Sequence, residues 1–133
     1  MLAVGEHLWG QVDDRTRRMT SGLAGGVGCS YQELCGALSG GALIIGSLYG
    51  RASADEDDAE SNRLVSLYRD RFLAHFGTTR CQDLRDGGFG SEGQWPCSEL
   101  VYQATRILWG VLGEQLLRSR CAQSAWRQSA GRR

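Results

Sequence analysis

Residues 33–51 have the sequence ELCGALSGGALIIGSLYGR, and this stretch decides the fold. Between Glu33 and Arg51 lie 17 residues without a formal charge, rich in leucine, isoleucine and glycine. A bilayer-spanning helix needs about 20 predominantly apolar residues, and the many glycines lower the hydrophobicity of this stretch further. We therefore expect a buried central helix over Leu34–Tyr49 rather than a membrane span.

The glycines of this central helix predict that other groups approach it closely. Each glycine costs roughly 1 kcal/mol relative to alanine inside a helix, so neighbouring helices or a bound group must offset that cost. Gly36 directly follows Cys35, and Gly40 lies one turn later. We therefore place them among the residues that would bind a cofactor.

Apolar residues recur at helical spacing along most of the chain, and no segment alternates long enough to predict a pair of strands. We predict an all-α fold, a single-domain bundle of about five helices over residues 1–117. The helices expected besides the central one cover residues 2–9, 13–25, 54–76, a short segment around Cys81, and a last segment from near Cys97 to Leu116. Three of the starts carry capping-box pairs, namely Ser30 with Glu33, Ser53 with Glu56, and Thr79 with Gln82.

The end of the chain differs in composition from the rest. From residue 118 onward the apolar pattern stops, and residues 118–133 contain five arginines and no acidic residue. We expect this segment to be a disordered tail outside the helical domain.

Composition excludes several classes of protein. The 133 residues include 15 basic and 15 acidic ones, so the net charge of zero predicts neither a nucleic acid nor an anionic membrane as partner. All the basic residues are arginine, which excludes a Schiff-base lysine and a phosphate-loop lysine. The start of the chain has no secretory signal pattern, so we expect a cytoplasmic protein.

The five cysteines are the candidate chemical groups. In a reducing compartment they favour metal binding, catalysis or redox sensing over a permanent disulfide framework. Cys35, Cys81 and Cys97 fall within the first two turns of predicted helices, where the helix dipole lowers the pKa of a thiol below about 8.5. Arg80, next to Cys81, is expected to act in the same direction. Three helix starts can converge on one site in a small bundle.

Other interpretations of these residues stay open. Each of the three cysteines can be a small buried apolar side chain, and this is the favoured interpretation for Cys121. Cys29 either approaches the same site or lies at the helix entrance without a role in it. There is no CxxC pair and no CxxCH motif, which argues against a thioredoxin-type dithiol, a zinc ribbon and covalent haem. His7 and His75 are far apart in sequence, so a Cys–His nucleophile pair would require a tertiary contact. The glycine-rich residues 22–28 lack the GxGxxG pattern of a nucleotide-phosphate loop and predict a turn between helices.

The segment Cys35–Gly40 fits the motif CGAxxG and resembles the C_GCAxxG_C_C family, small bacterial and archaeal proteins to which redox activity is ascribed. The resemblance includes GGVG at residues 25–28 and LYGR at residues 48–51, and extends through Cys81 and Cys97 to about Leu117. It implies an all-helical domain with four signature cysteines, often encoded near transporter genes. Cys35 matches the motif cysteine, and Cys81 and Cys97 match the two later ones. The first signature cysteine, which in the family lies slightly upstream of the position of Met1, has no counterpart here.

Together these observations predict a cysteine-based redox or electron-transfer protein with Cys35, Cys81 and Cys97 in one site. Two mechanisms fit, reversible disulfide exchange and ligation of an iron–sulfur cluster, with Cys29 as a possible fourth ligand. The alternatives are a module that holds zinc or another soft metal through the same sulfurs, and a helical interaction protein that packs against a partner or a second copy. The expected partners are an unidentified redox protein and, from the resemblance, a membrane transporter.

Overall fold

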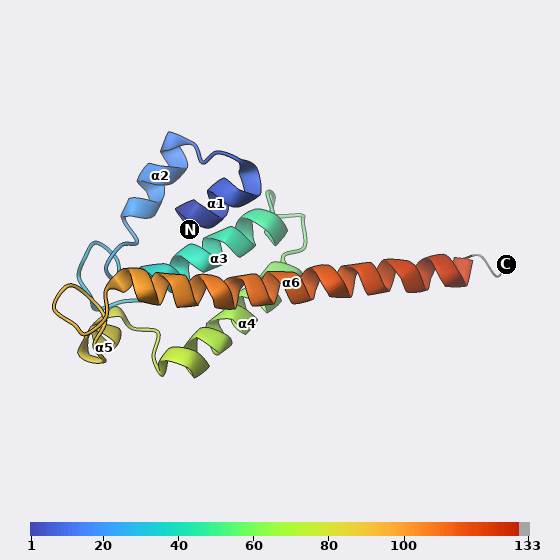
Figure 1. The fold of residues 1–133 in the computed structure, drawn as a ribbon. Coiled ribbons are helices and arrows are strands. Elements are labelled where there is room, and N and C mark those ends of the chain that lie inside the picture. The colour runs from blue at the N-terminus through green and yellow to red at the C-terminus, as the bar shows by residue number, and fades with distance from the viewer. Residues whose placement is uncertain (131–133) are drawn as a thin grey trace.

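The helix α3 (Gly36–Tyr49) lies at the centre of the structure, a computed structural model that describes the backbone of residues 1–130 and the side chains of residues 1–120. It packs against α4 (Ala59–Phe76) and α6 (Cys97–Ala130), which also pack against each other. In Figure 1, α1 (Leu2–Trp9) and α2 (Asp14–Ser21) lie on one side of α3, and α4 lies on the other. The short α5 (Cys81–Asp86) precedes the loop that leads into α6. The described residues thus form an all-α fold of six helices with two isolated β-bridges.

The packed core is formed by the facing surfaces of α3, α4 and α6. Its fully buried side chains are Ile44 and Ile45 of α3, Leu64, Tyr68 and Phe72 of α4, and Val111 of α6. Burying one such side chain stabilises the fold by about 1.5–3 kcal/mol. This three-helix contact holds α3 in place and so supports the cysteine that precedes it.

Gly41 shows why the central helix needs glycine. A Cβ atom added there would lie 2.3 Å from a ring carbon of Tyr68, well inside van der Waals contact. The Tyr68 hydroxyl donates a 3.1 Å hydrogen bond to the backbone oxygen of Ala37, one turn earlier. Close packing of α4 therefore offsets the low helix propensity of glycine, as expected from the sequence.

No helix in the described part of the chain is both long enough and apolar enough to cross a lipid bilayer. The predicted buried role of α3 is confirmed by its core residues, of which Ile44 and Ile45 have no exposed surface.

Two predicted capping boxes are wrong because their side chains form loop contacts instead. The Ser30 hydroxyl donates to the backbone oxygen of Gly26, and α3 begins after Cys35 without a side-chain cap. The Glu56 carboxylate accepts from the backbone amide of Ala52, so the acidic segment stays a loop and α4 begins at Ala59 rather than Ala54.

Two further helix limits differ from the predicted ones. The helix α2 ends at Ser21, whereas the sequence predicted that it would continue to the glycines at residues 25 and 26. The third predicted capping box, Thr79 with Gln82, is wrong as well: α5 begins after Arg80 without a side-chain cap, and the backbone amide of Gln82 donates to the backbone oxygen of Tyr31.

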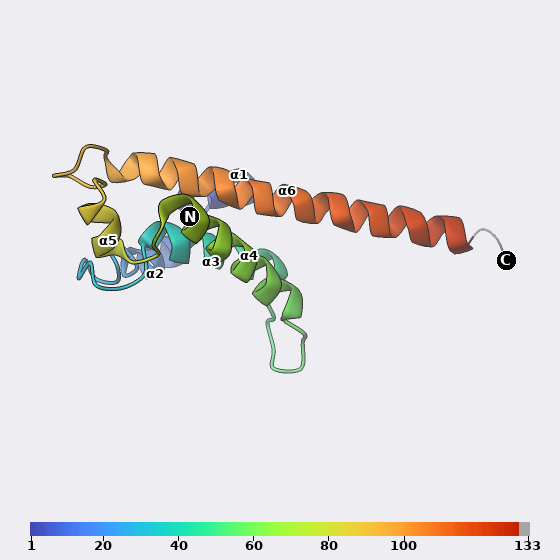
Figure 2. The ribbon, with the colours of Figure 1, turned by 90° about the horizontal axis from the view of Figure 1, so that it is seen from below.

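The last helix starts at Cys97 as predicted and continues past Leu117 to Ala130. Its second half extends beyond the other helices (Figures 1 and 2). The division into a domain over residues 1–117 and a separate tail stays a prediction. The side chain of Cys121 and the arginines at positions 127, 132 and 133 lie outside the described side chains.

Candidate functional site

A short backbone pairing joins the segments that precede α3 and α5. Leu34 and Arg80 form an antiparallel bridge. On either side of it, the Cys35 amide donates to the oxygen of Thr79 and the Cys81 amide donates to the oxygen of Glu33, both at 2.9 Å. This clasp, defined by residues 33–35 and 79–81, fixes the starts of two helices against each other.

The clasp explains why two of the thiols meet. Successive side chains of an extended segment point to opposite faces, and bridge partners share one face. Leu34 and Arg80 take the outer face, where both are exposed. Cys35 and Cys81 consequently share the inner face, which turns toward the start of α6.

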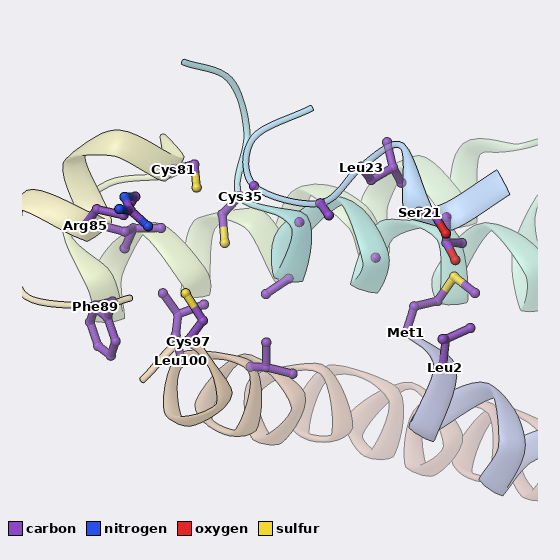
Figure 3. Close-up of a pocket in the computed structure, with 18 of the residues that line it drawn as sticks. Met1, Leu2, Ser21, Leu23, Cys35, Cys81, Arg85, Phe89, Cys97 and Leu100 are labelled. Atoms are coloured by element: carbon purple, nitrogen blue, oxygen red, sulfur yellow. The ribbon is translucent and has the colours of Figure 1, made fainter. Parts of the chain in front are cut away.

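Cys97, the first residue of α6, completes the group from the opposite side. In Figure 3 the sulfur atoms of Cys35, Cys81 and Cys97 point into one space between the three helix starts. All three residues line a cavity of about 360 Å³, which extends along α3 toward the start of α1. Cys35 is buried with 8% of its surface exposed, Cys81 is partly buried and Cys97 is exposed. The structure therefore brings together the three cysteines that the sequence analysis grouped, and all three are free thiols.

A left-handed segment packs behind Cys81. Gly25, Gly26, Val27, Gly28 and Cys29 all have φ between 56° and 69°, so the chain makes a left-handed turn here. A Cβ atom added to Gly26 would lie 2.7 Å from the Cβ of Cys81. Glycine is needed at this position both for its backbone angle and for this contact. The predicted turn between helices is confirmed, and it braces the site.

The other site residues of the sequence analysis lie around the cavity. Gly36 and Gly40 line it on the side of α3. Cys29 does not line it, but lies near enough to Cys81 for its thiolate charge to raise the pKa of that thiol. Neither histidine lines the cavity, since His75 pairs with Gln103 and His7 packs edge-on against Trp109.

The expected lowering of the thiol pKa is wrong for Cys35 and Cys81. Burial raises the pKa of Cys35, and this outweighs its hydrogen bonds from the backbone amides at the start of α3. Burial is also the main cause of the raised pKa of Cys81, followed by the nearby Cys97 thiolate. Desolvation disfavours the charged form of a thiol and here exceeds the effect of the helix start.

Arg85, not Arg80, is the arginine that acts on Cys81. The Arg85 charge lowers the pKa of Cys81 in opposition to burial, whereas Arg80 is hydrogen-bonded to Gln32 and Asp83. Arg85 follows Cys81 by four residues, the spacing at which helical side chains are neighbours. That spacing is the sequence signal that could have identified Arg85. Its guanidinium lies 4.2 Å from the centre of the Tyr31 ring, a contact that holds it at the site.

The donor set does not form a closed metal centre. Among the described side chains, no group of three or more His, Cys, Asp or Glu residues is arranged so that it could hold a metal ion. The three sulfurs face a common cavity instead. Ligation of zinc or of an iron–sulfur cluster by Cys29, Cys35, Cys81 and Cys97 stays a prediction.

A family model described as "Putative redox-active protein (C_GCAxxG_C_C)" matches residues 1–110. The chain belongs to this family. None of the curated proteins and none of the solved structures matches it. The match in the C_GCAxxG_C_C family covers all three cavity cysteines and every helix that positions them, including the first part of α6.

Proposed function

We propose that this protein is a thiol–disulfide redox protein in which Cys97 and Cys81 form a reversible disulfide. The observation that carries the proposal is the cavity into which three free thiols point from the starts of three helices (Figure 3). The family description supports redox chemistry of this kind but names no mechanism.

Exposure assigns the first step to Cys97. Cys97 is an exposed residue at the cavity, so we assign it the reaction with a partner disulfide, whereas Cys35 is buried. The Cys97 thiolate attacks one sulfur of the partner, the partner's S–S bond breaks, and one partner thiolate leaves. The product of this step is a mixed disulfide between Cys97 and the partner.

The charges around Cys81 assign it the second step. While Cys97 is a thiolate, its charge raises the pKa of Cys81. The mixed disulfide removes that charge, so Cys81 loses its proton more readily, and the Arg85 charge stabilises the resulting thiolate. Cys81 then attacks the sulfur of Cys97 and releases the second partner thiolate. Overall, two protein thiols are oxidised to a disulfide and one partner disulfide is reduced to two thiols.

Cys35 has a different part in this scheme. Its raised pKa keeps the thiol protonated at neutral pH, and its burial shields it from a macromolecular partner. From the clasp it lies beside Cys81, where it serves as a third thiol that exchanges with the Cys81–Cys97 disulfide. This assignment predicts a slower, secondary disulfide between Cys35 and Cys81.

The test is disulfide mapping on anaerobically purified protein. The reduced protein is treated with hydroxyethyl disulfide, free thiols are alkylated, and peptides are identified by mass spectrometry. We expect a Cys81–Cys97 disulfide that a reductant reverses. Cys97→Ser and Cys81→Ser should abolish it, and the matched control Cys29→Ser, at an exposed cysteine outside the cavity, should retain it.

Metal analysis of the same preparation separates the competing mechanisms. Iron with acid-labile sulfide would contradict the proposal in favour of a cluster, and stoichiometric zinc would contradict it in favour of a metal-binding module. Oxidation that leaves Cys81 and Cys97 as free thiols would contradict it directly.

A further inference from the structure

The cavity beside the thiols has the wall of a small-molecule site. Its volume of about 360 Å³ lies within the range of about 300–1,000 Å³ that such sites have. Its wall includes Leu84, Phe89 and Leu100, and Figure 3 shows Phe89 and Leu100 near the sulfurs. Leu84 and Leu100 are buried in the core, which fixes this end of the wall.

One polar side chain of the wall, besides the cysteines, is free to bind a ligand. The Arg85 guanidinium points toward the thiol end in Figure 3, and no described side chain forms a hydrogen bond or an ion pair with it. The other polar side chains of the wall, apart from the cysteines, are already engaged. Arg17 binds Glu6 and the oxygen of Val12, and the hydroxyls of Thr20 and Ser21 both donate to the oxygen of Arg17. The wall therefore fits a ligand with an apolar body and a hydrogen-bond acceptor at its thiol end.

The burial of Cys35 limits the size of that ligand. Cys35 lines the cavity with 8% of its surface exposed, so a folded protein cannot contact it there, but a small molecule inside the cavity can. A hydrophilic peptide disulfide would need several polar partners in the wall, and among the described polar side chains other than the cysteines only Arg85 is free. An apolar small molecule matches the cavity better.

We infer that the cavity binds a quinone, which accepts the electron pair of the dithiol while Arg85 donates hydrogen bonds to one of its ring oxygens. A quinone has an apolar ring, carbonyl acceptors and a two-electron capacity, which are the three properties that the wall and the thiols require. The inference rests on the proposed function for its redox step and on the cavity alone for binding.

The reaction balances without a further reactant. The thiols of Cys81 and Cys97 lose two protons and two electrons, their S–H bonds break and one S–S bond forms. The quinone gains both protons and both electrons and becomes a hydroquinone with two O–H bonds. Arg85 stabilises the negative charge that develops on the ring oxygen before protonation.

Binding is tested first, in a protein that cannot react. The triple variant Cys35→Ser, Cys81→Ser, Cys97→Ser is titrated with duroquinone, whose fully methylated ring has no free position for thiol addition. We expect saturable binding in equilibrium dialysis. Adding Arg85→Gln should weaken it about tenfold, because a charged hydrogen bond is lost. The matched control Arg106→Gln, an exposed arginine of α6 outside the cavity, should not change it.

A second variant fills the cavity without disturbing the core. Val101 lines the cavity and is 43% exposed, so Val101→Trp can be accommodated by a fold that circular dichroism would report as intact. We expect it to abolish binding in the triple variant. In the protein with all its cysteines, it should also slow duroquinone reduction at least tenfold while oxidation by hydroxyethyl disulfide continues.

The outcomes separate this inference from the proposed function. No binding by the triple variant, or binding that Val101→Trp leaves unchanged, would overturn the quinone site even if hydroxyethyl disulfide still forms the Cys81–Cys97 bond. Binding to the triple variant without disulfide formation in the native protein would support the site and contradict the redox step.

Discussion

The two faces of α3 use glycine in opposite ways. On the face toward α4, Gly41 lets the Tyr68 ring fill the space completely, and the neighbouring isoleucines have no exposed surface. On the face toward α1 and α2, Gly36 and Gly40 line a cavity beside three thiols. The backbone at Leu23 still approaches Gly36 closely, since a Cβ atom added to Gly36 would lie 2.9 Å from the oxygen of Leu23. One glycine-rich helix therefore supplies stability on one face and access to the thiols on the other.

We expect the largest difference between the two faces when one side chain on each is truncated and the change in the free energy of unfolding is measured. Phe72→Ala removes a side chain with no exposed surface from the filled face and should lower the free energy of unfolding by about 4 kcal/mol. Val101→Ala, in the cavity wall, should change it by less than about 0.5 kcal/mol. Urea denaturation measures both, and equal effects would contradict the contrast between the faces.

A methyl group added to α3 sharpens the same contrast. Gly41→Ala should destabilise the protein by about 3 kcal/mol, because the new Cβ would overlap the Tyr68 ring and α4 must move. The control is Gly46→Ala on the same helix, where a Cβ meets no atom within 4 Å and the higher helix propensity should add up to about 1 kcal/mol. A neutral Gly41→Ala would show that α4 does not pack as closely as described.

The buried thiol makes stability depend on pH. An unfolded thiol loses its proton near pH 8.5, whereas burial raises the pKa of Cys35 in the folded protein. Between these two pKa values the folded state binds more protons than the unfolded state. The contribution of the Cys35 thiol to stability is therefore fully present below about pH 8.5 and is lost as the pH rises, by up to about 1.4 kcal/mol per pH unit. Cys35→Ala should make this decline less steep in denaturation curves from pH 8 to 10, and the raised pKa of Cys81 should leave part of it. Ser39→Ala, one turn further along α3, should leave it unchanged.

The smallest effect is expected in the left-handed segment that braces the cavity side. Val27 has φ of 63°, a conformation that costs a β-branched residue roughly 1–2 kcal/mol. Val27→Asn should therefore raise the free energy of unfolding by about 1 kcal/mol. Val101→Asn, at an ordinary helical position, should give no gain, and a loss at Val27 would show that its side chain makes a contact worth more than the strain.

Periodicity predicted the helices well because their apolar faces are long. Capping signals failed at Ser30, Ser53 and Thr79, because groups of each motif form another hydrogen bond. The Ser30 hydroxyl donates to the oxygen of Gly26, the Glu56 carboxylate accepts from the Ala52 amide, and the backbone amide of Gln82 donates to the oxygen of Tyr31. A short motif cannot show which of two local hydrogen bonds the tertiary structure favours.

The grouping of the cysteines was predictable, but their electrostatics were not. The helix-start positions of Cys35, Cys81 and Cys97 are visible in the sequence, and the structure brings them to one cavity. The sign of the pKa shift depends on burial, which arises from packing of α3 and α6 and has no local signature. The pairing of Leu34 with Arg80 likewise joins two segments without strand-like patterns.

The clasp has a consequence for the synthesis of the protein. Its hydrogen bonds join residues that leave the ribosome at very different times, so Cys35 has no thiol neighbour in the cavity until α5 has been made. Cys97 arrives later still, with the helix that closes the bundle. The three sulfurs therefore come to face one cavity only when the last helix docks.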